Sequence, residues 1–367
     1  MNPIEMNPNN EKMLTPAEMA EALKKECGKP DTAFRIFFHK RPDGDAIGSA
    51  YALALCLYSL GADTETVCSD PVPQRFHELT KPAEEILSLP HGKKEHVVNI
   101  AVDTGSAPRL GKYSDVKIDI CIDHHVTNYI NNPEHLPAAL RLVEPEESSC
   151  AEIIFKLFGL MNVKMSVLEA DLIYTGLITD ASCFRARCTR RESLITAAAV
   201  SEINEEHIVD IARKHFMRKR PAQIKMEIAA YSRMRFSEDE SVLGTYVTYN
   251  DYRECGIEDC DLEGFNDAID QICRPDGKGV PVHVIVRELK PSFCRVSVTA
   301  RLPVNAARIC RGLGGGGHDN AAGCEMNCDP KEALDRTMEA CIEDIKNYMP
   351  GSDLCHMDTG SSLRKVK

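Results

Sequence analysis

The sequence of 367 residues contains no tryptophan, no long hydrophobic run and no excess of basic charge. No run approaches the ~18 consecutive apolar residues that a membrane helix needs, so we expect no membrane-spanning segment. The N-terminus, MNPIEMNPNNEK, lacks the basic and then apolar pattern of a signal peptide, and we therefore expect a cytoplasmic protein.

The formal net charge of -12 argues against a general surface for duplex DNA, because long phosphate backbones are usually met by a basic excess. The charge is unevenly distributed. Residues 1–212 hold 21 basic and 32 acidic side chains, whereas residues 213–320 hold 17 and 15. This asymmetry fits a metal-binding half joined to an anion-binding half, and uneven solvated surface charge explains it equally well.

The 16 cysteines do not form the paired CxxC motifs of a zinc ribbon. They are scattered along the chain, and the tightest pairs are separated by three or four residues. Without a secretory signal, we interpret them as reduced thiols, many of them buried as small hydrophobic side chains.

Short apolar runs alternate with helical patterns in the first half of the chain. Strands are predicted at Phe34–Phe38, Glu65–Cys68, Val97–Val102 and Ile118–Ile122, and the small-residue run from Ala46 predicts a helix. Nearly continuous apolar strands that alternate with helices are typical of a parallel sheet covered on both faces. We therefore predict an α/β fold with an N-terminal parallel-sheet domain.

A second, smaller α/β domain is predicted after the helical periodicity breaks near Phe236–Glu240, because strand-like runs resume there. The predicted organisation is a disordered N-terminus (1–12), a catalytic metal-binding domain (13–215), a connecting helix and linker (216–240), a substrate-binding domain (241–350) and a disordered tail (351–367).

Acidic and imidazole side chains follow the predicted strands. In an open α/β sheet, ligands bind beyond the carboxyl ends of the strands, so these side chains are expected at one edge. They are His39 with Asp43 and Asp45 in HKRPDGDAIGS, Asp103 in VDTG, and the run Asp123, His124 and His125. Asp180, in the turn of TDAS after a predicted helix, would add another carboxylate.

Concentrating these carboxylates in one cleft is costly unless cations neutralise them. Taken alone, Asp103 or Asp180 would be an ordinary turn former or helix cap. Together with the histidines, the set can supply two divalent ions about 3.5 to 4 Å apart. The mixture of imidazole and carboxylate favours Mn²⁺ over Mg²⁺ or Ca²⁺ without excluding Zn²⁺ or Fe²⁺.

These motifs resemble those of the DHH phosphoesterase superfamily, whose four N-terminal motifs appear here in order as HKRPDGDAIGS, VDTG, DHH and TDASCFR. The segment GLGGGGHDNAAG, from Gly312 to Gly323, resembles the GGGH motif of the DHH-associated domain. The most similar subgroup is the bifunctional oligoribonucleases and pAp phosphatases, or nano-RNases. One departure lies in the fourth motif, where Ala181 and Ser182 replace the usual Thr and Gly and put the local turn geometry in question.

The resemblance implies two Mn²⁺ ions, with Mg²⁺ or Co²⁺ as substitutes, and Asp103 as the bridging ligand. One ion would be held by His39, Asp43 and Asp103, and the other by Asp45, Asp103, His124 and Asp180. His125 would contact the scissile phosphate or protonate the leaving group. Asp123 more plausibly orients a histidine than binds metal.

Four consecutive glycines, Gly314, Gly315, Gly316 and Gly317, form a predicted loop in the second domain. Glycines allow positive φ and bring N–H groups close to an anion, although a flexible hinge is an equally good reading of the run alone. His318 and Arg301 can bind a terminal phosphate. In the resembled family, this domain grips the far end of the substrate in a cleft between the two domains.

The predicted function is a metal-dependent phosphoesterase that hydrolyses short oligoribonucleotides, dinucleotides and pAp, 3'-phosphoadenosine 5'-phosphate. The alternatives are a phosphodiesterase for cyclic or linear di-AMP and a pyrophosphatase or exopolyphosphatase with the same metal centre. A processive single-strand exonuclease is disfavoured, since no Trp is available for base stacking. A nucleotide sensor with a dead metal site would lack a ligand, and none is missing. The sequence leaves the oligomeric state open, a homodimer included.

Overall fold

The computed structural model describes residues 11–29, 31–88, 96–128, 135–186, 188–259, 265–301, 303–317 and 319–348. The chain divides into two compact units, Met1–Arg218 and Lys219–Lys367, and each is described here by itself. Residues 1–10 and the tail 351–367, both predicted to be disordered, lie outside the described residues. Glu11 and Lys12 differ from that prediction, because Lys12–Met13 form a short strand.

The first unit is built on a six-stranded sheet in which every paired strand is parallel. Its order is β1-β6-β5-β4-β2-β3. The strands are β1 (Lys12–Met13), β2 (Thr32–Phe37), β3 (Asp63–Val67), β4 (His96–Val102), β5 (Ile118–Asp123) and β6 (Ala138–Val143). The four predicted strands are present as β2, β3, β4 and β5, and the predicted α/β class is confirmed. The strand β6, with the sequence AALRLV, was not among the predicted strands.

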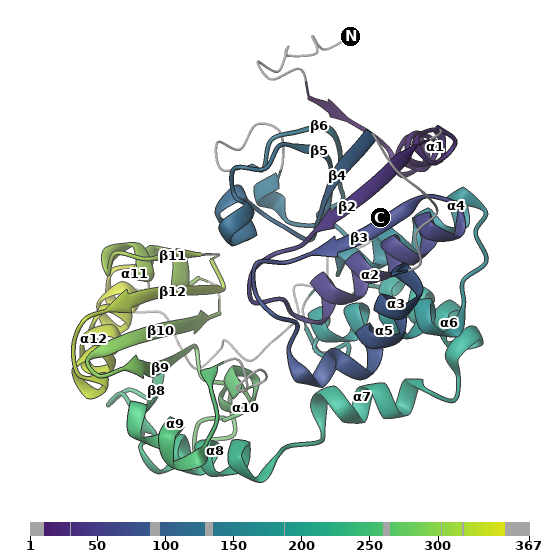
Figure 1. Cartoon of the computed structure of the whole chain (residues 1–367). Coiled ribbons are helices and arrows are strands. Elements are labelled where there is room, and N and C mark those ends of the chain that lie inside the picture. Colours follow the sequence, from purple (N-terminus) through teal and green to yellow (C-terminus); the bar gives the residue numbers. More distant parts are fainter. Residues whose placement is uncertain are drawn as a thin grey trace, which may run out of the picture. The chain divides into compact units, whose positions relative to one another are not determined.

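The helices of the first unit gather on one face of this sheet (Figure 1). They are α1 (Pro16–Cys27), α2 (Gly44–Ser59), α3 (His77–Leu87), α4 (Cys150–Met161), α5 (Val167–Asp180), α6 (Arg191–Asn204) and α7 (Ile208–Phe216). The small-residue helix α2 is buried over nearly its whole length and packs against both the sheet and α5. On the other face, the 3-10 helix Ala107–Tyr113 covers a smaller apolar cluster around Phe37 and Leu110.

Close packing of α2 against α5 depends on two small residues. A side chain at Gly48 would place its Cβ 2.3 Å from the carbonyl oxygen of Leu172 on α5, and one at Gly176 would lie 2.9 Å from Oδ1 of Asp45 on α2. Contacts this short do not occur, so only glycine fits at either position. The close approach brings the C-terminal end of α5 beside the N-terminal end of α2, where the site forms.

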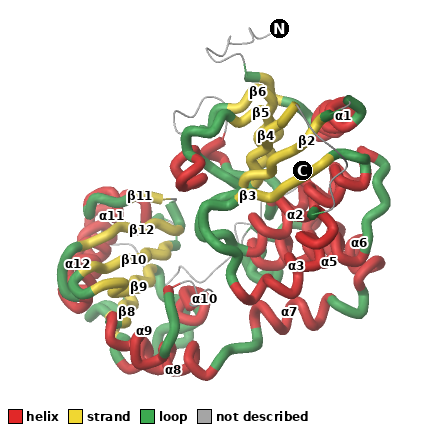
Figure 2. The backbone as a smooth tube through the Cα atoms, in the orientation of Figure 1, coloured by secondary structure: helices red, strands yellow, loops and turns green. Residues whose placement is uncertain are grey.

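The second unit contains a six-stranded sheet of order β11-β12-β10-β9-β8-β7, in which β8 and β9 are parallel and the other pairs antiparallel. The strands are β7 (Arg235–Phe236), β8 (Val242–Val247), β9 (Val282–Lys290), β10 (Phe293–Ala300), β11 (Gly316–Gly317) and β12 (Ala321–Met326). The helices are α8 (Pro221–Ser232), α9 (Tyr249–Cys255), α10 (Phe265–Asp270), α11 (Ala306–Gly312) and α12 (Pro330–Tyr348). Figure 2 shows this alternation of strands and helices along the backbone.

Two apolar clusters cover the two faces of the second sheet. One joins the strands to α11 and α12, and the other joins them to α8, α9 and α10. Met226 and Ala230 of α8 are fully buried in the second cluster. The helix predicted to be a connector is therefore part of the second unit's core.

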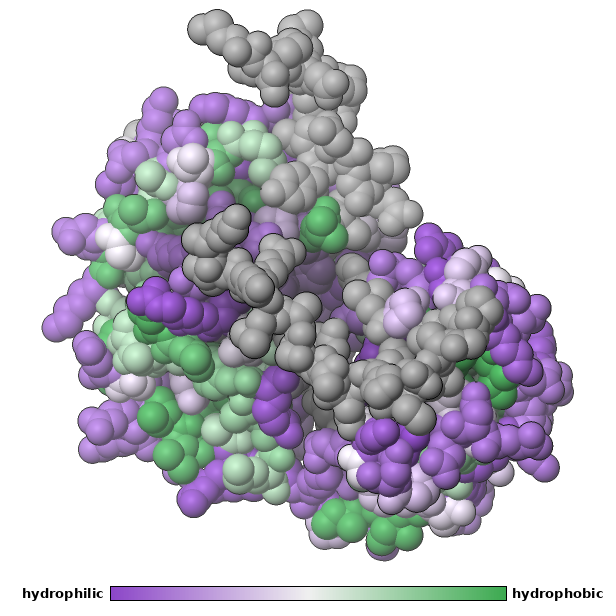
Figure 3. All heavy atoms as spheres, turned by 180° about the vertical axis from the view of Figure 1, so that it is seen from behind, coloured by the Kyte–Doolittle hydropathy of each residue, from purple (hydrophilic) through white to green (hydrophobic). Residues whose placement is uncertain are grey.

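The face drawn in Figure 3 carries many hydrophilic side chains, with patches of hydrophobic ones between them. Among the described residues, no helix has both the length and the apolar character needed to span a membrane. The cysteines of the described part of the chain are free thiols.

Candidate metal centre

His39 lies just beyond the end of β2 and is 2% exposed. Its Nδ1 lies 2.9 Å from the carbonyl oxygen of Lys40, which can only accept, so Nδ1 carries the proton. The lone pair is thereby left on Nε2. This atom lies 3.5 Å from Oδ2 of Asp43 and 3.5 Å from Oδ2 of Asp103.

Asp43 is the N-cap of α2. Its Oδ1 accepts hydrogen bonds from the backbone N–H groups of Asp45 (3.1 Å) and Ala46 (3.0 Å). Capping therefore occupies one carboxylate oxygen and leaves Oδ2 directed at His39. The loop between β2 and α2 thus delivers two predicted ligands to one place.

Asp45 is fully buried and is held by the N-terminus of α4. Its Oδ2 accepts the N–H of Cys150 at 2.6 Å, and its Oδ1 accepts the N–H of Ala151 at 2.9 Å and the hydroxyl of Ser49 at 3.0 Å. Unpaired N–H groups at a helix N-terminus favour a carboxylate. Oδ2 also lies 3.9 Å from Nε2 of His124.

Asp103 stands between the two groups of ligands. It follows β4 in the left-handed region, with φ of 50°, and its N–H donates to the carbonyl of Ile122 at the end of β5. One carboxylate oxygen faces His39, while Oδ1 lies 3.5 Å from Nε2 of His124. Asp103 thus faces both groups of candidate ligands.

His124 meets Asp180, the last residue of α5, with 3.3 Å between Nε2 and Oδ2. Its Nδ1 lies 3.3 Å from the carbonyl oxygen of Glu147, which leaves Nε2 free to face the carboxylates. His125 points its Nδ1 at Oδ1 of Asp123, 2.8 Å away. That oxygen of Asp123 also accepts the backbone N–H of His124, so Asp123 is occupied as an orienting group.

The electrostatics are those of a site that attracts positive charge. Burial and the charge of Asp103 raise the pKa of Asp45 to about 7, and desolvation and the charge of Asp45 raise the pKa of Asp180 well above its ordinary value. Burial opposes protonation of His39, but the carboxylates of Asp43 and Asp103 beside it raise the pKa of His39 to about 10. Burial opposes ionisation of Asp103, but the imidazoles of His124 and His39 beside it hold its pKa well below the ordinary range.

The donor set fits divalent cations. His39, Asp43 and Asp103 form one cluster of ligand atoms, Asp45, His124 and Asp180 form a second, and Asp103 with Asp123, His124 and His125 forms a third. The buried Nε2 of His39 and Oδ1 of Asp103 have no hydrogen-bond partner among the described residues, as expected of atoms that bind metal. The first two clusters coincide with the ligand sets implied by the sequence, apart from the bridging role of Asp103 in the second.

Ser182 is the residue that replaces the usual glycine in the fourth motif. It has φ of 45°, and Cys183 and Phe184 follow at 55° and 62°. The position at which glycine is usual therefore does adopt the left-handed conformation that glycine favours, and serine adopts it at a cost of roughly 1 to 2 kcal/mol. Asp180 keeps its place beside His124 all the same.

The predicted substrate-binding residues lie in the second unit, and their role in a cleft shared with the first unit stays a prediction. Arg301 follows β10, and its guanidinium packs so closely over Gly279 that a Cβ there would lie 2.0 Å from Nη1. The glycine run is more ordered than a loop, since Gly316–Gly317 form β11 against β12. Gly314 has φ of 83°, and a Cβ on Gly315 would meet the carbonyl of Gly323 at 2.1 Å. His318 lies outside the described residues.

The sequence analysis missed three contributors to the site. They are the helix N-terminus at Cys150 that holds Asp45, the buried Asn128 that contacts Asp123, and the buried Arg141 behind it. For Arg141, the one available signal in the sequence was an arginine between two leucines in the otherwise apolar segment LRLV.

Comparison with known proteins agrees with this geometry. The family model described as "DHH family, N-terminal domain" matches residues 33–177. This part of the chain is therefore similar to the N-terminal domain of the DHH family. The match includes every candidate ligand except Asp180, which lies three residues beyond its end.

Similar proteins span more of the chain than the DHH domain. A bifunctional oligoribonuclease and PAP phosphatase, NrnA, of Thermus thermophilus is 29% identical over 340 residues, which are 91% of this chain and 95% of that protein. A probable manganese-dependent inorganic pyrophosphatase of Streptococcus thermophilus is 24% identical over 64% of this chain and 84% of its own length. The crystal structure of an exopolyphosphatase-related protein from Bacteroides fragilis has the same fold, with a TM-score of 0.74, 22% identity, and coverage of 90% of this chain and 97% of that one.

Proposed function

We propose that this protein is a metal-dependent phosphoesterase that hydrolyses pAp and short oligoribonucleotides. The observation that carries the proposal is the extent of the similarity to NrnA, which covers 91% of the chain and so includes both units. The pyrophosphatase relative covers 64% of the chain. A phosphoesterase of the NrnA type accounts for the metal centre and for the second unit together.

The candidate ligands divide into two sets that share Asp103. His39, Asp43 and Asp103 would hold one Mn²⁺, and Asp45, Asp103, His124 and Asp180 would hold the other. Divalent ions at such a site lower the pKa of a bound water and neutralise charge on the phosphate. The manganese dependence named for the pyrophosphatase relative supports the choice of metal.

The protein's own groups orient the reaction. Lys40 and Glu147 hold the Nδ1 atoms of His39 and His124 through their backbone carbonyls, and the α4 N-terminus holds Asp45. Asp123 raises the pKa of His125 against the opposing effect of burial, so His125 can donate a proton or hydrogen bond from Nε2. We assign it to the scissile phosphate or to the departing ester oxygen, which needs a proton when its P–O bond breaks.

Recognition of the substrate's far end is assigned to the second unit. A guanidinium and backbone N–H groups of a glycine run suit a terminal phosphate. Arg301, Gly314, Gly315, Gly316, Gly317 and His318 are the proposed binding residues. The mild basic excess of residues 213–320 supports an anion-binding role for this part of the chain.

A second candidate function is pyrophosphatase activity, favoured by the relatives of that name. A panel of pAp, di- to pentaribonucleotides, linear and cyclic di-AMP, and pyrophosphate, each with Mn²⁺, separates the candidates. We expect pAp and short RNA to be cleaved with the highest kcat/KM and all activity to stop in excess EDTA. Pyrophosphate as the best substrate, or full activity without metal, would overturn the proposal. Protein carrying Asp103→Asn controls for contaminating nucleases.

A further inference from the structure

Asn128 closes the short 3-10 helix Val126–Asn128 that follows the DHH run, and it is fully buried. Its side-chain amide uses all its hydrogen-bonding capacity. Nδ2 donates to Oδ2 of Asp123 and to the carbonyl of Thr104 (2.7 Å), and Oδ1 accepts the N–H of Leu136 (2.8 Å) and Nη2 of Arg141 (3.3 Å). A backbone N–H and a guanidinium can only donate, so the oxygen of the amide must face them and the nitrogen must face Asp123.

The contacts of Asn128 join two parts of the candidate centre. Thr104 follows the bridging candidate Asp103 at the end of β4, and Asp123 ends β5 and orients His125. Oδ1 of Asp123 is already occupied by the two histidines of the run. Among the described residues, the amide of Asn128 is the hydrogen-bond donor to the other oxygen, and this contact keeps the carboxylate from rotating about its own axis.

Arg141 anchors Asn128 from the far side of the centre. It lies on β6 and is fully buried. Its guanidinium donates to the carbonyls of Leu136 and Asn128 and to the side-chain oxygen of Asn128. A buried cation needs a counter-charge. Glu11 supplies it, since its side chain is 3% exposed and Oε2 lies 3.6 Å from Nη1.

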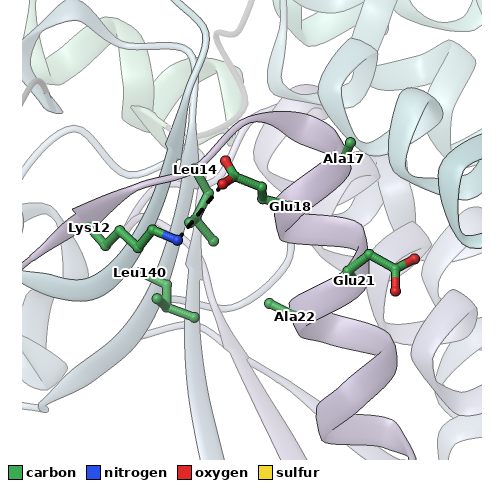
Figure 4. A pocket seen from close by; sticks show the side chains of 7 residues that line it. All are labelled: Lys12, Leu14, Ala17, Glu18, Glu21, Ala22 and Leu140. Carbon is green, nitrogen blue, oxygen red and sulfur yellow. Dashed lines mark ion pairs between the residues drawn. The ribbon is translucent and has the colours of Figure 1, made fainter.

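The short strand β1 keeps Glu11 in place. It pairs with β6 in register with Leu140 and Arg141, and the N–H of Leu14 donates to the carbonyl of Arg141 at 2.7 Å. Figure 4 shows Lys12 of this strand paired with Glu18 of α1, beside Leu14 and Leu140. The edge of the sheet is thereby connected to the DHH run through a continuous buried polar chain, from Glu11 through Arg141 and Asn128 to Asp123.

We propose that Asn128 is a positioning residue for this centre. It holds the carboxylate of Asp123, and through it the imidazole of His125, in one orientation, and the Arg141–Glu11 pair is its anchor. The inference rests on the proposed function for its kinetic test alone, because the orientation of His125 is measurable without turnover.

Asn128→Asp tests the proposal with little change in volume. The new carboxylate keeps one oxygen toward Leu136 and Arg141 but turns the other toward Asp123, where it repels instead of donating. Asn204→Asp is the matched control. Asn204 is 2% exposed, and its Nδ2 donates to Oδ1 of Asp171 at 3.0 Å. The same exchange therefore again places two carboxylates against each other. Asn204 lies on α6 and Asp171 on α5, and neither belongs to the candidate centre.

We expect Asn128→Asp to lower kcat on pAp by roughly 10- to 100-fold, as is typical when the partner of a site residue is lost. KM and the bound manganese, measured by elemental analysis, should stay close to wild type, whereas Asn204→Asp should lose thermal stability and keep its kcat. Equal kcat losses in the two variants would mean that Asn128 supports only the fold. An unchanged kcat in Asn128→Asp would equally overturn the proposal.

A second readout follows His125 directly in ¹⁵N-histidine-labelled protein with Mg²⁺, its resonances assigned with His125→Gln. Wild type should show one set of His125 signals with a proton on Nδ1, and Asn128→Asp should shift or broaden those signals while Asn204→Asp leaves them in place. Unchanged signals in Asn128→Asp would overturn the proposal. If wild-type protein were inactive on every substrate, that result would contradict the proposed function. The spectra would still decide whether Asn128 positions His125. If Asn128→Asp does not fold, Glu11→Gln replaces it and is read by the same shifts.

Discussion

Asp123 holds His125 at two points, with Oδ1 lying 2.8 Å from the imidazole Nδ1 and 3.2 Å from the backbone nitrogen of the same residue. A carboxylate that accepts from Nδ1 fixes the proton there and directs Nε2 away from itself. His125 is thus oriented without being tied to a metal through Nδ1. The pairing separates the role of His125 from that of its neighbour His124, whose Nε2 faces three carboxylates.

His125→Ala should lower kcat on pAp by about 100-fold or more, the range typical of a lost general acid. Because His125 acts on the phosphate or the leaving group, KM should change little and both manganese ions should remain bound. Steady-state kinetics together with elemental analysis of the purified variant test this. A variant that loses metal in proportion to its activity would show that His125 is a ligand.

Asp103→Asn should fail in a different way, because this side chain faces both His39 and His124. Replacing one carboxylate oxygen by an amide removes charge and one donor from the candidate bridge, so manganese occupancy should fall by at least one ion per chain. Titration of the variant with Mn²⁺ measures the loss. Two fully bound ions at the concentration that saturates wild type would exclude a bridging role.

Ser182→Gly should stabilise the protein by up to ~1.5 kcal/mol. Glycine removes the cost of the left-handed conformation, which is about 1 to 2 kcal/mol. Its greater freedom in the unfolded chain opposes this gain by about 0.5 to 1 kcal/mol. Denaturant unfolding compares the midpoints of wild type and variant. Ser114→Gly is the control, because Ser114 follows the 3-10 helix Ala107–Tyr113 with a φ of -56°, and this variant should be destabilised. A destabilised Ser182→Gly would show that the serine is held by more than its backbone.

The strand ends of the first unit were predictable from sequence because two simple signals coincide there. Apolar runs located β2, β4 and β5, and parallel strands place their carboxyl ends at one edge. His39, Asp103 and His124 follow such runs directly, so their convergence required no knowledge of the helices. Asp180 was predicted as a further carboxylate in a turn after a helix, and its position beside His124 depends on the close packing of α2 and α5 at Gly48 and Gly176.

Residues that act through tertiary contacts were not predictable in the same way. Asn128 reads as a turn former, and its role appears only once Leu136 and Arg141 lie beside it. β6 was not predicted, and the counter-charge of its buried Arg141 comes from Glu11, a distant part of the sequence that only the fold brings close. The glycine run was predicted as a loop, and pairing with β12 turns half of it into a strand.

Arg301→Ala tests the assignment of substrate recognition to the second unit. If Arg301 holds a terminal phosphate, its loss should lower kcat/KM on pAp and dinucleotides by roughly 10- to 1,000-fold, as expected for a charge-assisted contact of about 1.5 to 3 kcal/mol or somewhat more. Gly279→Ala should have an effect in the same direction, because a Cβ there would meet the guanidinium at 2.0 Å and displace it. Arg336→Ala removes an exposed arginine from the same unit and should leave kcat/KM unchanged.

The decisive comparison uses bis(p-nitrophenyl) phosphate, which has no distant phosphate to be held. Its slow hydrolysis depends on the metal centre alone, so Arg301→Ala and Gly279→Ala should hydrolyse it at the wild-type rate. Substrate length gives an independent check, because a binding site at a fixed distance from the centre should favour two to five nucleotides over long strands, and the variants should lose that preference. Equal losses on pAp and on bis(p-nitrophenyl) phosphate would mean that Arg301 supports the fold of the second unit, and recognition of the terminal phosphate would have to be assigned elsewhere.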